Sequence, residues 1–215
     1  MSNDNTFSTS LEHLPTEIFL QVFGLLPLQE IVTAFSGLNS YIDSVIQSVI
    51  GASHVVRYSD AEAINSLHFF PTQIIRLIIV NVEIADFTAL INLRSLTLKY
   101  GTQEQFNSIR PQYFPMLEIL HIKGLHTTMN ENTQTISNLF QAIFSNDFPR
   151  LRICTTFDVG AVAFSDTWIG SPALHTLNLN MKTKHDCEQF RSVCLHLRRL
   201  TTYQTSMGDP PTGKG

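Results

Sequence analysis

The chain has 215 residues, and its 14 Lys and Arg against 18 Asp and Glu give a formal net charge of −4 at pH 7. This balance argues against a nucleic-acid-binding protein, which needs a basic face, and no apolar run approaches the roughly 20 residues that span a bilayer. Residues 1–10 lack the basic start and apolar segment of a secretory signal. Three cysteines and the lack of any Asn-x-Ser/Thr sequence favour a reducing compartment, so we expect a cytoplasmic or nuclear protein that binds neither membrane nor nucleic acid.

After a disordered amino terminus, residues 1–10, the chain is predicted to form three short helices in residues 11–50. Pro15 suits the start of the first helix, because the N–H that it lacks would be unpaired there. Glu17 puts a negative charge in the first turn, where the helix dipole favours it, and Pro27 ends the helix. Apolar residues at spacings of three and four form a wide stripe on it: Ile18, Phe19, Val22, Phe23 and Leu26.

The second predicted helix begins near Leu28 and the third near Ser40, with Gly37 and Asn39 as the break between them. Both continue the apolar spacing of the first. A unit of about 40 residues is at the lower limit of size for burying a core of its own. Its apolar surface therefore needs a partner protein or a second domain.

Residues 51–69 are expected to be a linker or a first helix, and a repeated pattern follows in residues 70–205. The pattern is apolar-x-x-apolar-x-apolar, which suits a short strand with one buried face. By subtraction, successive copies start 19, 24, 34, 23 and 23 residues apart. They start at Ile74, Leu93, Leu117, Leu151, Leu174 and Leu197.

Amphipathic stripes between several copies predict helices that alternate with the strands. Such alternation predicts an α/β fold, a solenoid with parallel strands on its concave side and helices on its convex side. The long interval that starts at Leu117 predicts an insertion in residues 126–133. The helical stripes are Ile136, Leu139, Phe140, Ile143 and Phe144, then Cys187, Phe190, Val193 and Cys194, and more weakly Phe106 and Ile109.

Residues 11–50 resemble an F-box, the motif that docks onto the small Skp-family adaptor of cullin-based ubiquitin ligases. The matching residues are Leu14-Pro15-x-Glu17-Ile18, Val22-Phe23-x-x-Leu26, Ile31, Phe35 and Leu38. Glu30-Ile31 stands where the family usually has Asp-Leu, and Tyr41 is the aromatic residue nearest to a usual Trp. The resemblance implies adaptor contacts for Leu14, Pro15, Ile18, Phe19, Val22, Phe23, Leu26, Ile31, Phe35, Leu38 and Tyr41.

The repeats resemble degenerate leucine-rich repeats, which typically measure 20 to 29 residues. An F-box followed by such repeats is familiar from substrate receptors of SCF (Skp–cullin–F-box) ubiquitin ligases. The resemblance implies a non-catalytic subunit that binds the Skp-family adaptor, and through it a cullin, at one end and a protein substrate at the other. The alternative is a repeat scaffold with no ligase role, in which the apolar stripe folds back onto the repeats. Exposure of Leu14, Pro15, Ile18 and Val22 to solvent would favour the ligase subunit over the repeat scaffold.

Substrate contact is expected on the concave face, where the side chains between the apolar anchors of each predicted strand point. The mixture there is polar and mildly basic, which suits protein recognition, while the alternative for any one residue is a merely solvated strand position. In the first predicted strand, apolar Ile78 and Val80 indicate that the F-box region or its linker packs over that edge. The candidate substrate-binding residues are Lys99, His121, Lys123, Phe157, Asn178, Asn180, Arg199 and Tyr203.

No catalytic residue, cofactor or metal site is predicted. The final GDPPTGKG nearly has the spacing of a phosphate-binding loop, but Gly215 stands where Ser or Thr would bind magnesium. Residues 206–215 are instead predicted to be a disordered tail. His185, Cys187, Cys194 and His196 have side chains that can ligate zinc, but both cysteines lie on an apolar helix stripe, where buried core thiols explain them better.

Overall fold

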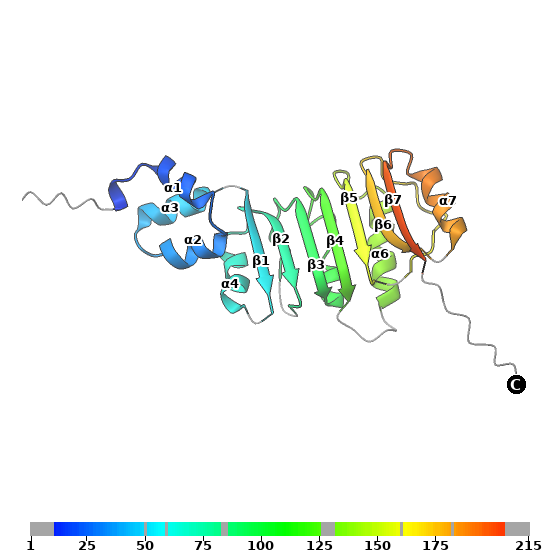
Figure 1. Cartoon of the computed structure of the whole chain (residues 1–215), viewed down its shortest axis with the longest axis horizontal. Coiled ribbons are helices and arrows are strands. Elements are labelled where there is room, and N and C mark those ends of the chain that lie inside the picture. Colours follow the sequence, from blue (N-terminus) through cyan, green and yellow to red (C-terminus); the bar gives the residue numbers. More distant parts are fainter. Residues whose placement is uncertain are drawn as a thin grey trace, which may run out of the picture.

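The computed structural model describes residues 11–49, 51–58, 60–82, 86–125, 132–159, 161–181 and 183–204. In these ranges a unit of short helices stands beside one seven-stranded sheet, whose strands are all parallel and follow one another in chain order (Figure 1). The chain is therefore a mixed α/β protein. Among the described helices, none has the length and apolar character that a membrane span requires.

The amino-terminal unit comprises a short 3-10 helix (Leu11–His13), α1 (Thr16–Phe23), α2 (Leu28–Phe35) and α3 (Ser40–Ser48). The strands are β1 (Ala52–Arg57), β2 (Ile74–Val80), β3 (Ser95–Gly101), β4 (Ile119–Leu125), β5 (Ile153–Phe157), β6 (Thr176–Met181) and β7 (Arg199–Gln204). The connecting helices are α4 (Ala61–Phe69), α5 (Gln103–Asn107), α6 (Asn132–Phe144) and α7 (Lys184–Val193).

The helical unit encloses a small core of its own. Pro15 and Pro27 directly precede α1 and α2, and the Asn39 side chain caps α3 by accepting a hydrogen bond from the backbone N–H of Ile42 at 2.8 Å. Aromatic rings fill the centre, with ring centroids 5.7 Å apart for Phe19 and Phe23 and 5.1 Å apart for Phe23 and Phe35. The buried apolar residues of the unit are Phe19, Phe23, Leu28, Ile31, Ile42, Val45 and Ile46.

Equivalent residues of successive strands stack in register across the sheet. Leu96 pairs with Leu77 on one side and with Leu120 on the other, and all three are fully buried. The same row continues through Cys154, Leu177 and Leu200. Each repeat thus completes the core of its neighbour, so the fold is stabilised mainly by contacts between adjacent repeats.

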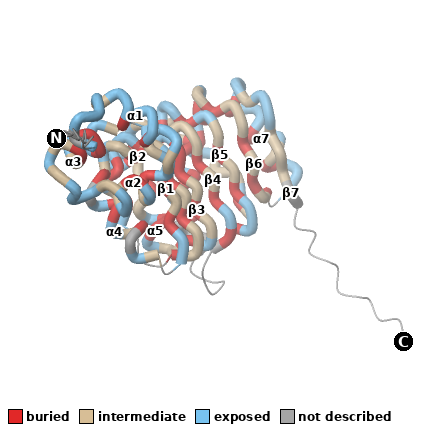
Figure 2. The backbone as a smooth tube through the Cα atoms, turned by 60° about the vertical axis from the view of Figure 1, so that its left-hand side comes forward, coloured by how far each residue is buried: buried red, intermediate tan, exposed pale blue. Residues whose placement is uncertain are grey.

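The two faces of the sheet differ in what covers them. Helices α4, α5, α6 and α7 follow β1, β3, β4 and β6 and lie on one face, as right-handed crossovers between consecutive parallel strands require (Figure 1). The other face carries no helix in the described ranges. Buried and half-buried residues alternate along the strands, as Figure 2 shows in red and tan. We call this second surface the helix-free face.

The repeat pattern predicted the strands of this sheet from β2 onward. All six predicted strands appear, as β2 to β7, and the three predicted helical stripes form α5, α6 and α7. The predicted insertion, residues 126–133, lies mostly outside the described residues, as do residues 1–10 and 206–215. The strand-by-strand order predicted for residues 70–205 is thus the observed one.

Residues 51–69 contain a strand that the sequence analysis did not predict. β1 precedes α4 and pairs with β2 along its whole length. Val55 pairs with Ile78 and Arg57 with Val80, so the segment before β2 does pack against its edge, as the apolar residues of β2 indicated. The repeat pattern missed β1 because its core row is occupied by His54 in place of an apolar residue.

Candidate functional site

Six large apolar side chains along α1 and its two flanks are exposed to solvent. One of them, Leu20, lies on the opposite side of α1, and the other five form one set. They follow one another at spacings of three and four residues, which is the spacing of one helical face. Leu11 is 50% and Leu25 is 86% exposed, and the three members between them are each about 40% exposed. We call this set the α1 stripe: Leu11, Leu14, Ile18, Val22 and Leu25.

The α1 stripe lies on a helix that packs within the helical unit and not on the sheet. α2 contacts both β1 and α4, whereas α1 packs on α3. Figure 1 shows α1 away from the sheet, and Figure 2 shows much of α1 in the colour of exposed residues. The stripe therefore offers an apolar surface that no described helix or strand covers.

The residues predicted to contact an adaptor fall into three groups in the structure. Leu14, Pro15, Ile18, Val22 and Leu38 are exposed, and Leu26, Phe35 and Tyr41 are half-buried. Phe19, Phe23 and Ile31 are at most 3% exposed, because they form the core of the helical unit. A protein docked on the intact unit would not touch these three. They instead support the exposed residues from inside the helical unit. Leu11 and Leu25 were missed, although the same spacing extends to both.

Tyr41 holds α1 against α3. Its hydroxyl donates a hydrogen bond to the carbonyl oxygen of Leu14 at 3.0 Å and lies 3.1 Å from Oγ1 of Thr16. Its ring meets that of Phe19 edge to face, with centroids 6.1 Å apart. The start of α1, where the stripe begins, is thus fixed in place by a side chain from the third helix.

Polar contacts join the helical unit to the sheet. Nε2 of Gln29, on α2, donates to the carboxylate of Asp60 at 3.3 and 3.4 Å, and the same carboxylate caps α4 by accepting from Ala63 N at 2.9 Å. Nε2 of buried His54 lies 2.8 Å from the Ala63 carbonyl oxygen and 2.9 Å from Ser66 Oγ. Burial lowers the pKa of His54, so the ring is neutral in the folded protein near pH 7.

The centre of the helix-free face contains cations and a histidine on adjacent strands. Lys99 of β3 pairs directly with Lys123 of β4, and Thr97 pairs with His121 one step along the same strands. His121 Nδ1 is hydrogen-bonded to Thr155 Oγ1. Burial first, and then the charge of Arg76, lower the pKa of His121, so the Arg76 charge acts on the same part of the face.

The other predicted substrate-binding residues extend this face toward β7. Phe157 is 37% exposed and Arg199 is exposed, while Asn178 and Asn180 are half-buried. Oδ1 of Asn178 is buried without a hydrogen-bond partner. The side chain of Tyr203 lies outside the described residues. The predicted set therefore lies on one surface from β3 to β7, and no pocket brings its members together within the described ranges.

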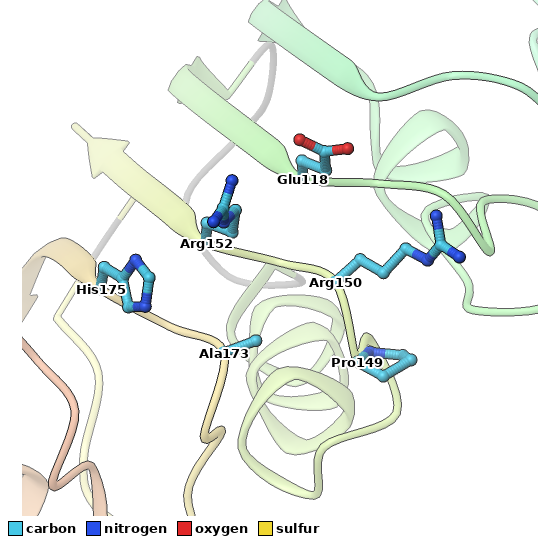
Figure 3. Close-up of a pocket in the computed structure, with 6 residues that line it drawn as sticks. All are labelled: Glu118, Pro149, Arg150, Arg152, Ala173 and His175. Carbon is cyan, nitrogen blue, oxygen red and sulfur yellow. The ribbon is translucent and has the colours of Figure 1, made fainter.

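A hollow of about 390 Å³, lined by charged side chains together with Pro149 and Ala173, lies at the edge of the sheet where the strands begin and was not predicted from the sequence. Figure 3 shows Glu118, Arg152 and His175, which precede three neighbouring strands, beside Pro149, Arg150 and Ala173 from the connecting loops. Glu118 Oε1 forms an ion pair with Arg94 at 3.7 Å. The signal in the sequence is the residue directly after each first leucine, which is charged or His at Arg94, Glu118, Arg152, His175 and Arg198.

The cysteines have the environment of core thiols. Burial raises the pKa of Cys154 to about 12 and also raises that of Cys194, so neither is a thiolate near pH 7. Cys187 is half-buried and packs against the same core. In the part of the chain that the structure describes, no three His, Cys, Asp or Glu side chains gather as metal ligands would. The GDPPTGKG segment lies outside the described residues.

Comparison with known proteins adds no assignment to this geometry. No protein-family model matches the chain, and a search of the curated proteins finds no match either.

Proposed function

We propose that the chain is the substrate-binding subunit of an SCF-type ubiquitin ligase. In this proposal, residues 11–50 act as an F-box that docks onto a Skp-family adaptor, and through it a cullin. The strands from β2 onward act as degenerate leucine-rich repeats, whose helix-free face binds a protein substrate. The chain itself contributes no catalytic residue and no cofactor.

The observation that carries this proposal is the exposure of the α1 stripe. Apolar side chains scattered singly on a surface need no explanation, but a run at helical spacing marks a contact surface. The alternative, a repeat scaffold whose helices serve only its own core, requires that Leu14, Ile18 and Val22 fold back onto the repeats. All three are about 40% exposed, which favours a partner protein.

The division of α1 into two faces also supports an F-box role. Phe19 and Phe23 point into the helical unit and give it a core, while Ile18 and Val22 point outward from the same helix. A docking motif needs both, since a surface that binds without rearranging must be held by a packed interior. The hydrogen bonds of the Tyr41 hydroxyl to the start of α1 add to this pre-organisation.

The arrangement suits catalysis by tethering. One end of a rigid body holds the ligase and the other holds the substrate, so lysines of the substrate reach a high effective concentration near the ubiquitin-carrying enzyme. Gln29, Asp60 and His54 join the two ends through α2, α4 and β1. A fixed distance between the ends, which tethering requires, follows from these contacts.

The test is a pull-down of purified chain with a recombinant Skp-family adaptor, beside an Ile18→Lys, Val22→Lys variant. Two cations on the apolar stripe would be desolvated in the complex, so we expect binding to be lost. Leu20→Lys is the matched control, because Leu20 is on the opposite side of α1 and is also exposed. All three chains must give the same circular dichroism spectrum.

Two results would refute the proposal and favour the repeat scaffold. One is a folded wild-type chain that binds no Skp-family adaptor. The other is a loss of binding as large in Leu20→Lys as in the double variant, which would mean that added charge, and not the α1 stripe, controls the interaction.

A further inference from the structure

The charged residues of the described strands are all basic, and all lie on one face of the sheet. The seven described strands contain five Lys and Arg residues and no Asp or Glu. The register of the strands puts all five on the helix-free face, at positions that alternate with the buried core. They are Arg57, Arg76, Lys99, Lys123 and Arg199.

Among the described residues, the cations at the centre of this face have no ion-pair partner. Lys99, Lys123 and Arg76 make no ion pair with any described residue, since the ion pair that the described ranges contain joins Arg94 to Glu118. Lys99 and Lys123 are direct neighbours on adjacent strands, an arrangement of like charges that destabilises a sheet. An anionic ligand bound between them would remove this repulsion.

Beside polar Thr97 and His121 at its centre, the helix-free face also carries apolar, β-branched side chains. Val55 and Ile78 are neighbours on β1 and β2, and Ile119 and Ile153 are neighbours on β4 and β5. All four lie on the helix-free face and are half-buried. A ligand that matches this surface combines negative charge with apolar side chains, which is the chemistry of an acidic protein segment.

A long polyanion fits the molecule less well than such a segment does. Residues 1–56 contain no Lys or Arg, and the described helices of the amino-terminal unit carry Glu17, Glu30 and Asp43. These helices are joined to the same rigid body, so a nucleic acid or an anionic membrane that extends past β1 meets repulsion. A short acidic segment on the helix-free face avoids them.

We propose that the helix-free face, centred on Lys99 and Lys123, binds an Asp- and Glu-rich segment of a partner protein that also carries apolar residues. This inference rests on the proposed function, for which it names the class of substrate. Binding is electrostatic in part, so affinity falls as salt rises.

The experiment measures binding of a fluorescein-labelled peptide, in which Asp and Glu alternate with Leu, by fluorescence anisotropy at low and at physiological salt. The test variant is Lys99→Glu, Lys123→Glu, and we expect it to bind at least about tenfold more weakly. The matched control is Lys184→Glu, Arg191→Glu, which changes the net charge equally at exposed positions of α7. It should retain the wild-type affinity. Lys99→Gln, Lys123→Gln repeats the test without introducing acids, in case the first variant does not fold.

Three results would overturn the inference. They are a peptide that does not bind, a loss of affinity that is equal in the control, and tighter, Lys99- and Lys123-dependent binding of a single-stranded oligonucleotide or an anionic phospholipid vesicle. The adaptor pull-down, run on the same variants, separates this inference from the proposed function. Adaptor binding without peptide binding refutes the acidic ligand alone, whereas peptide binding without adaptor binding refutes the ligase role and keeps the acidic ligand.

Discussion

The helical unit and the sheet each bury one apolar surface, and the surfaces that they leave to solvent differ in kind. The helices expose an apolar stripe on a unit without a single Lys or Arg up to residue 56, and the sheet exposes a basic, polar face without an acidic residue in any described strand. An apolar stripe suits a permanent, desolvated interface, while a charged face suits faster and salt-dependent association. The two exposed surfaces thus differ in the chemistry of the partner that each would suit.

The largest expected effect is the difference in stability lost when a leucine is removed from the sheet core and from the α1 stripe. Leu120 is fully buried between Leu96 and Cys154, so Leu120→Ala should lower the free energy of unfolding by about 3 kcal/mol. Leu25 is 86% exposed, so Leu25→Ala should change it by no more than about 0.5 kcal/mol and weaken adaptor binding instead. Urea denaturation, with the slope m checked for constancy, measures both. A comparable loss of stability in the two variants would mean that the α1 stripe is part of the core.

A smaller effect is expected at the junction between the two regions, where buried His54 should make the free energy of unfolding depend on pH. Burial is the main cause that lowers the pKa of His54, while its bond to the Ala63 carbonyl and the charge of Asp60 act against it. The unfolded chain returns His54 to its usual pKa of 6.5, so the unfolded state binds a proton first as the pH falls. Neutral His54 therefore contributes its full stabilisation of the folded state above about pH 6.5. This contribution decreases as the pH falls from 6.5 to the lower pKa that His54 has in the folded protein.

His54→Gln removes this titration, so its free energy of unfolding should depend less on pH than that of the wild type below about pH 7. Thermal or urea unfolding over a pH series measures the slope. His121→Gln is the control for location: because the pKa of His121 is also lowered, this variant too should flatten the slope, but its ring lies on the helix-free face, so hydrogen exchange in β1 and α4 should stay as in the wild type. Hydrogen exchange in β1 and α4 should increase at low pH in the wild type and not in His54→Gln. An unchanged slope in His54→Gln would show that the junction does not titrate.

The repeats could be predicted from the sequence because their stabilising contacts recur in it. Leu93, Leu96 and Leu98 are all buried, and the next copy puts Leu120 beside Leu96 and Ile122 beside Leu98, so the spacing itself encodes the sheet. β1 escaped prediction because its core-row residue is His54, whose burial is made possible by partners on α4. The hydrogen bond that allows this histidine to be buried comes from a residue outside the strand, so the local sequence pattern does not mark His54 as a core residue.

The candidate surfaces could be predicted only in part. The apolar spacing marked Ile18, Phe19, Val22 and Phe23 as one stripe, but which of them point inward depends on how α3 packs on α1, which is a tertiary contact. The residues after the first leucine of each copy, from Arg94 to Arg198, can be found in the sequence, but that they form one row follows only from the side-by-side pairing of parallel strands. Sequence periodicity thus predicts that a surface exists more readily than it predicts which residues line it.

The smallest expected effect would sharpen the contrast between stability and binding on the helix-free face. Lys123→Glu turns the like-charge pair with Lys99 into an opposite-charge cross-strand pair, which should raise the free energy of unfolding by about 0.5 kcal/mol. The same change should weaken binding of the acidic peptide, because it neutralises Lys99 from within the chain. If Lys99 and Lys123 had no role in binding, a substitution that stabilises the fold would leave peptide binding unchanged. A variant that is more stable and binds the peptide as well as the wild type would show that Lys99 and Lys123 are ordinary surface residues.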